Sequence, residues 1–153
     1  MNTIQKTKQL MFSYGMNTNL AQMARRCPQA VSLGAAVLPG FRFEFKSFAT
    51  VVADYANDTV GVVWEISDEC EDALDILEGY PIYYTKQIVT VFIDGTPHTA
   101  MTYLMYPDEL LNLPSNSYYN LVADGYEEHG ISIDQLNNAI DRVQNQYLTA
   151  EAV

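Results

Sequence analysis

The sequence predicts a single α+β domain, a small mixed or antiparallel β-barrel with helices packed outside it, and three observations lead to this fold. The 153 residues suffice for one domain with a buried core. Strand patterns follow one another in pairs joined by short turns, instead of alternating with helices as in a parallel sheet. No internal repeat, low-complexity linker or change of composition divides the chain. We therefore expect one domain over residues 1–153, with a core at about 8–131 and a C-terminal helix at about 134–147.

The chain is expected to open with a strand, a tight turn and a helix. The strand is predicted from Lys8 to Tyr14, and Gly15 ends it because glycine can take the positive φ that a sharp turn often needs. The helix that follows has apolar residues at i, i+3, i+4 and i+7, and Pro28 ends it. Its possible N-caps are Asn17, Thr18 and Asn19, and its apolar stripe comprises Leu20, Met23, Ala24 and Cys27.

Strand patterns dominate the next forty residues. A turn is predicted at 38–40, where the sequence reads Leu-Pro-Gly. The strand over 41–46 alternates phenylalanine with charged residues, which indicates one buried and one solvated face. The β-branched segments 49–54 and 59–66 are predicted to form a hairpin or a close pair of strands joined through 56–58.

Helices and one hairpin are predicted in the second half. A helix capped by Ser67 or Asp68 should end at Gly79, a natural residue for a left-handed C-terminus. Asp94-Gly95 indicates a hairpin between strands at 84–93 and 96–106. A short helix is predicted near 118–124, and the last helix at 134–147.

Composition excludes some classes of partner. The net charge of −11 argues against binding to nucleic acid or to an anionic membrane. No segment approaches the 18 or so apolar residues of a membrane span, and Met1 to Gln9 lacks the apolar core of a signal peptide. Cys27 and Cys70 each fall on the apolar stripe of a predicted helix, where a free thiol behaves as a small hydrophobe. We therefore expect a reduced, cytoplasmic protein; the sequence does not indicate its oligomeric state.

Glu78 is the first candidate for chemistry. It falls in the last turn of its helix, where the macrodipole disfavours a carboxylate, and Leu77, Tyr80 and Pro81 are expected to desolvate it. Both effects raise the pKa of a carboxyl group, which is the direction a general base working near neutrality needs. The alternative is a solvated glutamate on a helix that merely ends at Gly79.

The turn Tyr14-Gly15-Met16-Asn17 is the second candidate. A strand, a glycine turn and a helix start can direct successive N–H groups at one anion, although most such junctions bind nothing. Tyr84 and Tyr118 are candidate pocket hydroxyls, with simple packing as the alternative. His98 and His129 are isolated and lack metal-ligand spacing, so they are not expected to form a metal site.

In combination these segments resemble the γ-glutamylcyclotransferase-like superfamily (the AIG2-like family), especially its bacterial members. The resemblance spans about residues 10–131, in order and at family-like spacing. It is carried by Phe12 to Leu20, Met23 to Pro28, Leu33 to Phe45, Val60 to Ile66, Leu74 to Gly79, Tyr84 to Lys86, Ser117-Tyr118 and Gly125 to Gly130.

The resemblance implies a reaction and roles for the candidate residues. The α-amine of a small γ-glutamyl compound would attack its own γ-carbonyl, closing 5-oxoproline and releasing an amine without metal or cofactor. Glu78 would be the general acid/base, and the turn at 14–17 would hold the substrate α-carboxylate. The chain has Met16 where the family usually has serine, and Asp75 matches a frequent aspartate of structural role.

Three functions remain open on this resemblance. The first is a γ-glutamyl cyclotransferase acting on a small γ-glutamyl substrate. The second is a non-catalytic module that binds a small ligand on the same fold. The third is removal of a γ-glutamyl protecting group in a biosynthetic pathway, where pocket walls formed by Tyr84, Tyr118 and the Met105–Leu113 loop would select the leaving amine.

Overall fold

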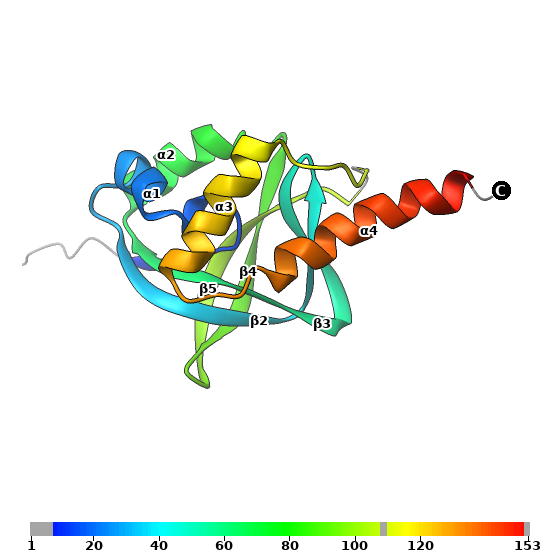
Figure 1. The fold of residues 1–153 in the computed structure, drawn as a ribbon. Coiled ribbons are helices and arrows are strands. Elements are labelled where there is room, and N and C mark those ends of the chain that lie inside the picture. The colour runs from blue at the N-terminus through cyan, green and yellow to red at the C-terminus, as the bar shows by residue number, and fades with distance from the viewer. Residues whose placement is uncertain (1–7, 108–109, 152–153) are drawn as a thin grey trace, which may run out of the picture.

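A computed structural model describes residues 8–107 and 110–151, and in it a closed β-barrel is flanked by helices (Figure 1). The strand order is β1-β3-β2-β4-β5, and a parallel contact between Met11 and Met101 closes the barrel, while the other pairs are antiparallel. The predicted fold class is therefore confirmed. The elements are β1 (Gln9–Ser13), the 3₁₀ turn η1 (Met16–Thr18), α1 (Leu20–Arg26), β2 (Val31–Lys46), β3 (Phe48–Ile66), α2 (Asp68–Glu78), β4 (Tyr84–Ile93), β5 (Thr96–Met105), α3 (Asn116–Glu128) and α4 (Asp134–Glu151).

The turn expected at 38–40 is wrong. These residues lie inside β2, a strand of 16 residues that pairs antiparallel with β3. The register shifts between Pro39 and Phe41, and Gly40 has a φ of 78°, so the Pro-Gly pair makes a bulge that bends the strand without reversing the chain.

The hairpin expected between 49–54 and 59–66 is also wrong, because both segments belong to the 19 residues of β3. The first half of β3 pairs with the end of β2 and the second half with its beginning, on either side of the bulge. The solvated face expected over 41–46 is wrong as well. Glu44 is 6% exposed and Lys46 9%, because α4 packs on this part of β2 and Arg142 donates a hydrogen bond to the Phe43 carbonyl.

Local signals placed the N-terminus of α1, both ends of α2 and the β4–β5 turn correctly, whereas α3 and α4 are longer than the predicted 118–124 and 134–147. Asn19 caps α1 by accepting a hydrogen bond from the Gln22 N–H, and Ser67 caps α2 in the same way through Cys70. Gly79 ends α2 in the left-handed conformation, with a φ of 64°. Asp94 and Gly95 both have positive φ and join β4 to β5, as the hairpin signal predicted.

Cys27 and Cys70 form a disulfide, so the prediction of two free thiols is wrong. The bond joins the C-cap of α1 to the first turn of α2, which lie next to each other over one end of the barrel together with α3 (Figure 1). The expected reducing, cytoplasmic setting rested partly on free thiols and loses that support.

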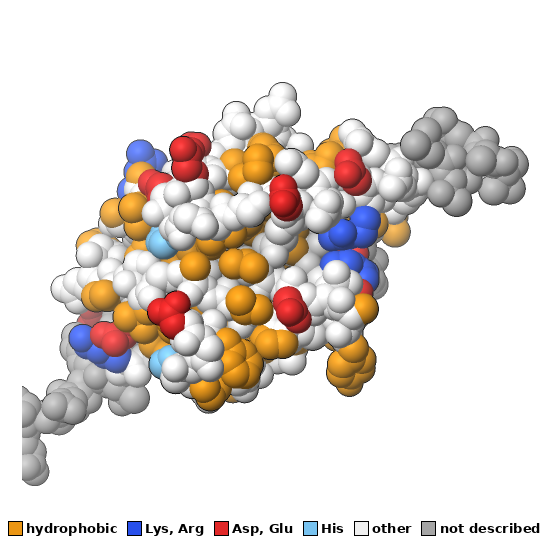
Figure 2. Space-filling view, turned by 60° about the horizontal axis from the view of Figure 1, so that its bottom comes forward, with side chains coloured by type: hydrophobic (Ala, Val, Ile, Leu, Met, Phe, Trp, Pro, Cys, Tyr) orange, Lys and Arg blue, Asp and Glu red, His pale blue; other side chains and the backbone are white. Residues whose placement is uncertain are grey.

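On the face that Figure 2 presents, carboxylates are scattered among apolar and uncharged side chains and do not gather in one patch. Within residues 8–107 and 110–151 no helix is long and apolar enough to cross a membrane. Most of the polar N-terminal stretch, residues 1–7, lies outside the described residues.

Candidate active site

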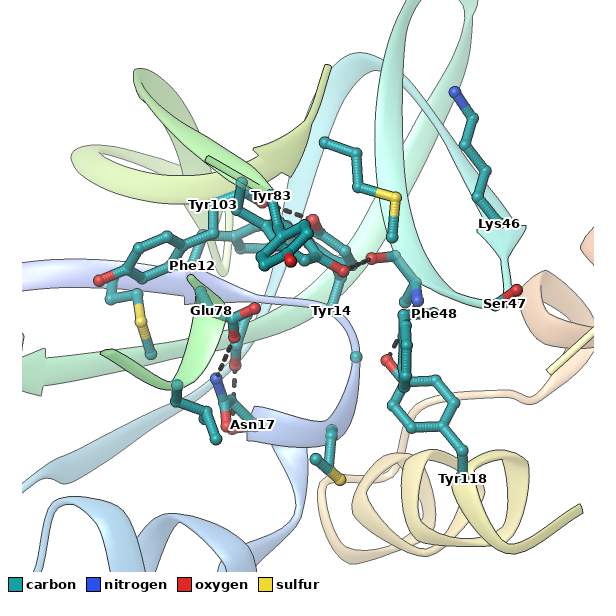
Figure 3. A pocket seen from close by; sticks show the side chains of 18 residues that line it. Phe12, Tyr14, Asn17, Lys46, Ser47, Phe48, Glu78, Tyr83, Tyr103 and Tyr118 are labelled. Carbon is teal, nitrogen blue, oxygen red and sulfur yellow. Dashed lines mark hydrogen bonds between the residues drawn. The ribbon is translucent and has the colours of Figure 1, made fainter. Parts of the chain in front are cut away.

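A cavity of about 640 Å³ opens at one end of the barrel (Figure 3). Its walls come from the end of β1 with η1, the β2–β3 turn, the C-terminal end of α2, the beginning of β4, the end of β5 and the first turn of α3. It brings together every residue that the sequence predicted for the site. These are Tyr14, Gly15, Met16, Asn17, Glu78, Tyr84 and Tyr118.

Glu78 is the last residue of α2, and its carboxylate lies half-buried in the wall of this cavity. Asn17 donates a hydrogen bond from Nδ2 to Glu78 Oε1 at 3.1 Å, and Arg26 Nη1 donates to Asn17 Oδ1 at 2.5 Å. Burial raises the pKa of Glu78 to about 7, against the charge of Arg26 and the Asn17 hydrogen bond, which both lower it. Glu78 is therefore a carboxyl group poised to gain or lose a proton near neutral pH.

The burial of Glu78 has a different source from the one expected. Tyr80 and Pro81 are exposed, Tyr80 at 40%, so these two neighbours do not desolvate the carboxylate. Leu77 does line the cavity, but an aromatic part of the wall comes from the end of β1 and the residue after it, where Phe12 and Tyr14 face the same space (Figure 3). The fold, rather than the local sequence, supplies the low-dielectric surroundings.

Close packing favours glycine at position 15. Its φ is −115°, so the expected positive φ is wrong. A Cβ at this position would lie 3.0 Å from the Ala49 Cβ and 3.1 Å from the Tyr118 hydroxyl. A side chain here would push Ala49 or Tyr118 away by a few tenths of an ångström, so glycine lets the turn approach β3 and α3 closely.

The turn at 14–17 lines the cavity, and η1 itself leaves two of the backbone N–H groups of this turn unused. The first bonds of η1 are donated by the Thr18 and Asn19 N–H groups, so the N–H groups of Met16 and Asn17 have no partner within it. Tyr118 accepts a hydrogen bond from the Ala49 N–H at 3.1 Å and another from the Met16 N–H. The Met16 side chain lines the cavity but offers no hydroxyl.

Tyrosines form much of the remaining wall. Tyr84 donates to the Ala49 carbonyl at 2.8 Å, and burial raises its pKa far above the usual value. Burial also raises the pKa of Tyr118 to about 12, which keeps its hydroxyl protonated. Tyr103 donates to Asp75 at 2.5 Å, and Asp75 pairs with Lys86 at 2.7 Å. Asp75 therefore holds Tyr103 in place, in agreement with the structural role expected of it.

Several residues of the site were missed by the sequence analysis. Tyr103 carried a signal, because Met101, Tyr103 and Met105 alternate along β5 and so face the same side of the sheet. Arg26 and Lys46 carried none. Lys46 lines the cavity only because the barrel closes, and Arg26 reaches Asn17 in the cavity wall only because α1 packs beside the turn. Within the described part of the chain, no group of three or more His, Cys, Asp or Glu side chains lies close enough to hold a metal ion.

The chain is similar in sequence to a known family and in fold to several solved structures. The sequence model of the family described as "Gamma-glutamyl cyclotransferase, AIG2-like" matches residues 11–121. A solved structure named "Gamma-glutamyl cyclotransferase" has a TM-score of 0.79 at 24% identity, covering 87% of this chain and 86% of its own. The structure of the human protein LOC79017 has a TM-score of 0.78 at 24% identity, covering 88% of this chain and 87% of its own. A yeast γ-glutamyl cyclotransferase described as specific to glutathione has a TM-score of 0.60 at 13% identity, covering 92% of this chain and 97% of its own.

These structural similarities establish a shared fold. A search among curated proteins finds no significant match.

Proposed function

We propose that this chain, which belongs to the gamma-glutamyl cyclotransferase, AIG2-like family, cyclises a small γ-glutamyl compound to 5-oxoproline and releases an amine. The α-amine nitrogen of the substrate attacks the γ-carbonyl carbon, a C–N bond forms, and the bond to the leaving nitrogen breaks. The reaction transfers no electrons and consumes no water. It needs one group that removes a proton from the α-ammonium and one that gives a proton to the departing nitrogen.

The observation that carries the proposal is Glu78 in the wall of the cavity, with a pKa raised to about 7. At neutral pH such a carboxyl group is about half ionised, so it can act first as base and then as acid. We assign both proton transfers to Glu78. Asn17 holds the carboxylate from the side of η1, which fixes the direction in which it can reach the substrate.

The turn at 14–17 supports the binding half of the proposal. The Asn17 N–H of η1 is assigned to the substrate α-carboxylate, because the Met16 N–H already donates to Tyr118; this contact uses the backbone, so the methionine at position 16 need not remove the site. The Tyr118 hydroxyl already accepts two backbone N–H bonds, so its own hydrogen is available to a substrate oxygen. Tyr84 forms the adjacent wall. Holding the amine close to the γ-carbonyl can contribute several kcal/mol to the rate.

The test is the identity of the product. The wild-type protein is incubated with γ-glutamyl-alanine and with γ-glutamyl alkylamines, and the products are followed by proton NMR. We expect equal amounts of 5-oxoproline and released amine, without glutamate. N-acetyl-γ-glutamyl-alanine, whose α-amine is blocked, should not react.

Two results would reject the proposal. Formation of glutamate in place of 5-oxoproline would mean that water, and not the α-amine, is the nucleophile. Absence of any product from the whole panel, combined with thermal stabilisation of the protein by 5-oxoproline, would favour the non-catalytic binding module instead.

A further inference from the structure

Lys46 is a largely buried residue of the cavity wall, and the proposed reaction does not use its ammonium group. It is the last residue of β2, is only 9% exposed, and lies across the cavity from Glu78 (Figure 3). The adjoining β2–β3 turn fixes its backbone. Ser47, with a φ of 67°, donates its N–H to the Asn112 carbonyl at 3.1 Å, and the Asn112 N–H donates to the Phe45 carbonyl at 3.1 Å.

No carboxylate of the described residues lies within the 4.0 Å of Lys46 that would make an ion pair. Glu44, two residues earlier and equally buried, pairs with Arg42 at 2.8 Å. Buried charges in proteins are normally paired in this way. The chain carries 19 acidic and 8 basic side chains, so a lysine without an acidic partner among the described residues is unexpected from the composition.

The surroundings of Lys46 suit an anion that arrives with the substrate. Phe48 and Met105 also line the cavity, and Phe48 packs edge-on against Tyr118 at a ring-centroid distance of 5.1 Å. Apolar walls lower the local dielectric and strengthen a charge–charge contact. The α-carboxylate of the γ-glutamyl group is already assigned to the turn at 14–17, so an anion at Lys46 has to come from the opposite end of the substrate.

We propose that Lys46 binds a carboxylate on the leaving group, so that the cavity selects γ-glutamyl amino acids or short peptides over uncharged γ-glutamyl amines. The inference rests on the proposed function, because it takes the orientation of the substrate from Glu78 and the turn at 14–17. Lys46 is on this view a specificity residue that takes no part in the proton transfers.

The test measures equilibrium binding, so it does not depend on turnover. γ-Glutamyl-alanine and γ-glutamyl-alanyl-glycine, each as the free acid and as the C-terminal carboxamide, are titrated by calorimetry into the full-length Glu78→Gln protein. Acid and amide have nearly the same shape and differ in charge. At one of the two lengths at least, we expect the acid to bind about tenfold or more tightly, the range of a charge-assisted hydrogen bond.

Variants of Lys46 and of a control lysine distinguish the effect of Lys46 on binding from the effect of the overall charge of the protein. Lys46→Met keeps the apolar length of the side chain and should abolish the preference, whereas Lys46→Arg keeps the charge and should retain it. The matched control is Lys8→Met, which removes an exposed lysine paired with Glu65 and should leave the preference unchanged.

Equal affinities for acid and amide at both lengths, or a preference that survives Lys46→Met, would overturn the inference. A failure of the proposed reaction looks different. The wild-type protein would then form no 5-oxoproline while the preference for the acid, and its loss in Lys46→Met, persisted.

Discussion

Replacing Arg26 by glutamine should raise the pKa of Glu78 and move the pH dependence of catalysis with it. Arg26 is linked to Glu78 through the side-chain amide of Asn17, and its charge is the largest influence that lowers the pKa of this carboxyl group against the effect of burial. Arg26→Gln removes the charge while leaving a side chain that can still bond to Asn17. The variant therefore isolates electrostatics from packing.

The size of the effect follows from the contact chain. With one amide between them, the two charged groups are at most about 8 Å apart, which at an effective dielectric constant of about 20–40 corresponds to about 1–2 kcal/mol. One pH unit corresponds to about 1.4 kcal/mol, so the pKa of Glu78 should rise by about one unit. The ionised fraction at pH 7 would then fall from about half to about one tenth, and the kcat/KM for 5-oxoproline formation by about fivefold.

The assay is the pH profile of kcat/KM between pH 5.5 and 9.5. The acidic limb of the Arg26→Gln profile should lie about one pH unit above that of the wild type, and the two should meet near pH 9. Arg25→Gln, which removes the exposed neighbouring arginine, is the matched control and should follow the wild type. An acidic limb that does not move, or a loss of rate that is the same at every pH, would refute this account of Glu78.

Three further predictions concern stability and the unusual residue of the turn. Because the fold raises the pKa of Glu78 from 4.5 to about 7, the stability that its protonated form provides below pH 4.5 is lost as pH rises through 7. The unfolding free energy of Glu78→Gln relative to wild type, from urea titrations, should therefore grow by about 2–3 kcal/mol between pH 4.5 and pH 8, and a pH-independent difference would contradict the burial of this carboxylate. The double variant Cys27→Ser/Cys70→Ser should lose about 2–4 kcal/mol of unfolding free energy, because the bond closes a loop across 43 residues; an unchanged urea midpoint would contradict the cross-link. Met16→Ser should change the KM by less than about threefold if the backbone N–H is the donor, whereas a tenfold lower KM would show that a hydroxyl at this position binds substrate.

Elements with local end signals were predicted well from the sequence. The Ser67 cap and Gly79 bound α2, and Asp94-Gly95 set the turn between β4 and β5, because each signal depends on a few neighbouring residues. The Pro39-Gly40 pair misled for the same reason. A turn and a bulge use the same residues, and which of them forms depends on a partner strand that is distant in sequence.

The residues of the site also fall into two groups, those that local sequence signals revealed and those that they did not. Glu78 could be recognised because a carboxylate at the C-terminal end of a helix opposes the helix dipole, and the turn at 14–17 because glycine ends the first strand there. Both line the cavity. Arg26 and Lys46 were not found, since their roles depend on neighbours that only tertiary packing supplies. The Cys27–Cys70 bond was missed because two apolar stripes do not reveal whether their helices meet.

The rate of 5-oxoproline formation by Glu78→Gln tests the central claim most directly. Glutamine keeps the shape of the side chain but cannot exchange a proton, so we expect the single-turnover rate at pH 8 to fall by about a hundredfold or more. Asp72→Asn, which neutralises an exposed carboxylate on the same helix, is the matched control and should retain the wild-type rate. A Glu78→Gln protein that forms 5-oxoproline as fast as the wild type would contradict the claim that Glu78 moves the protons.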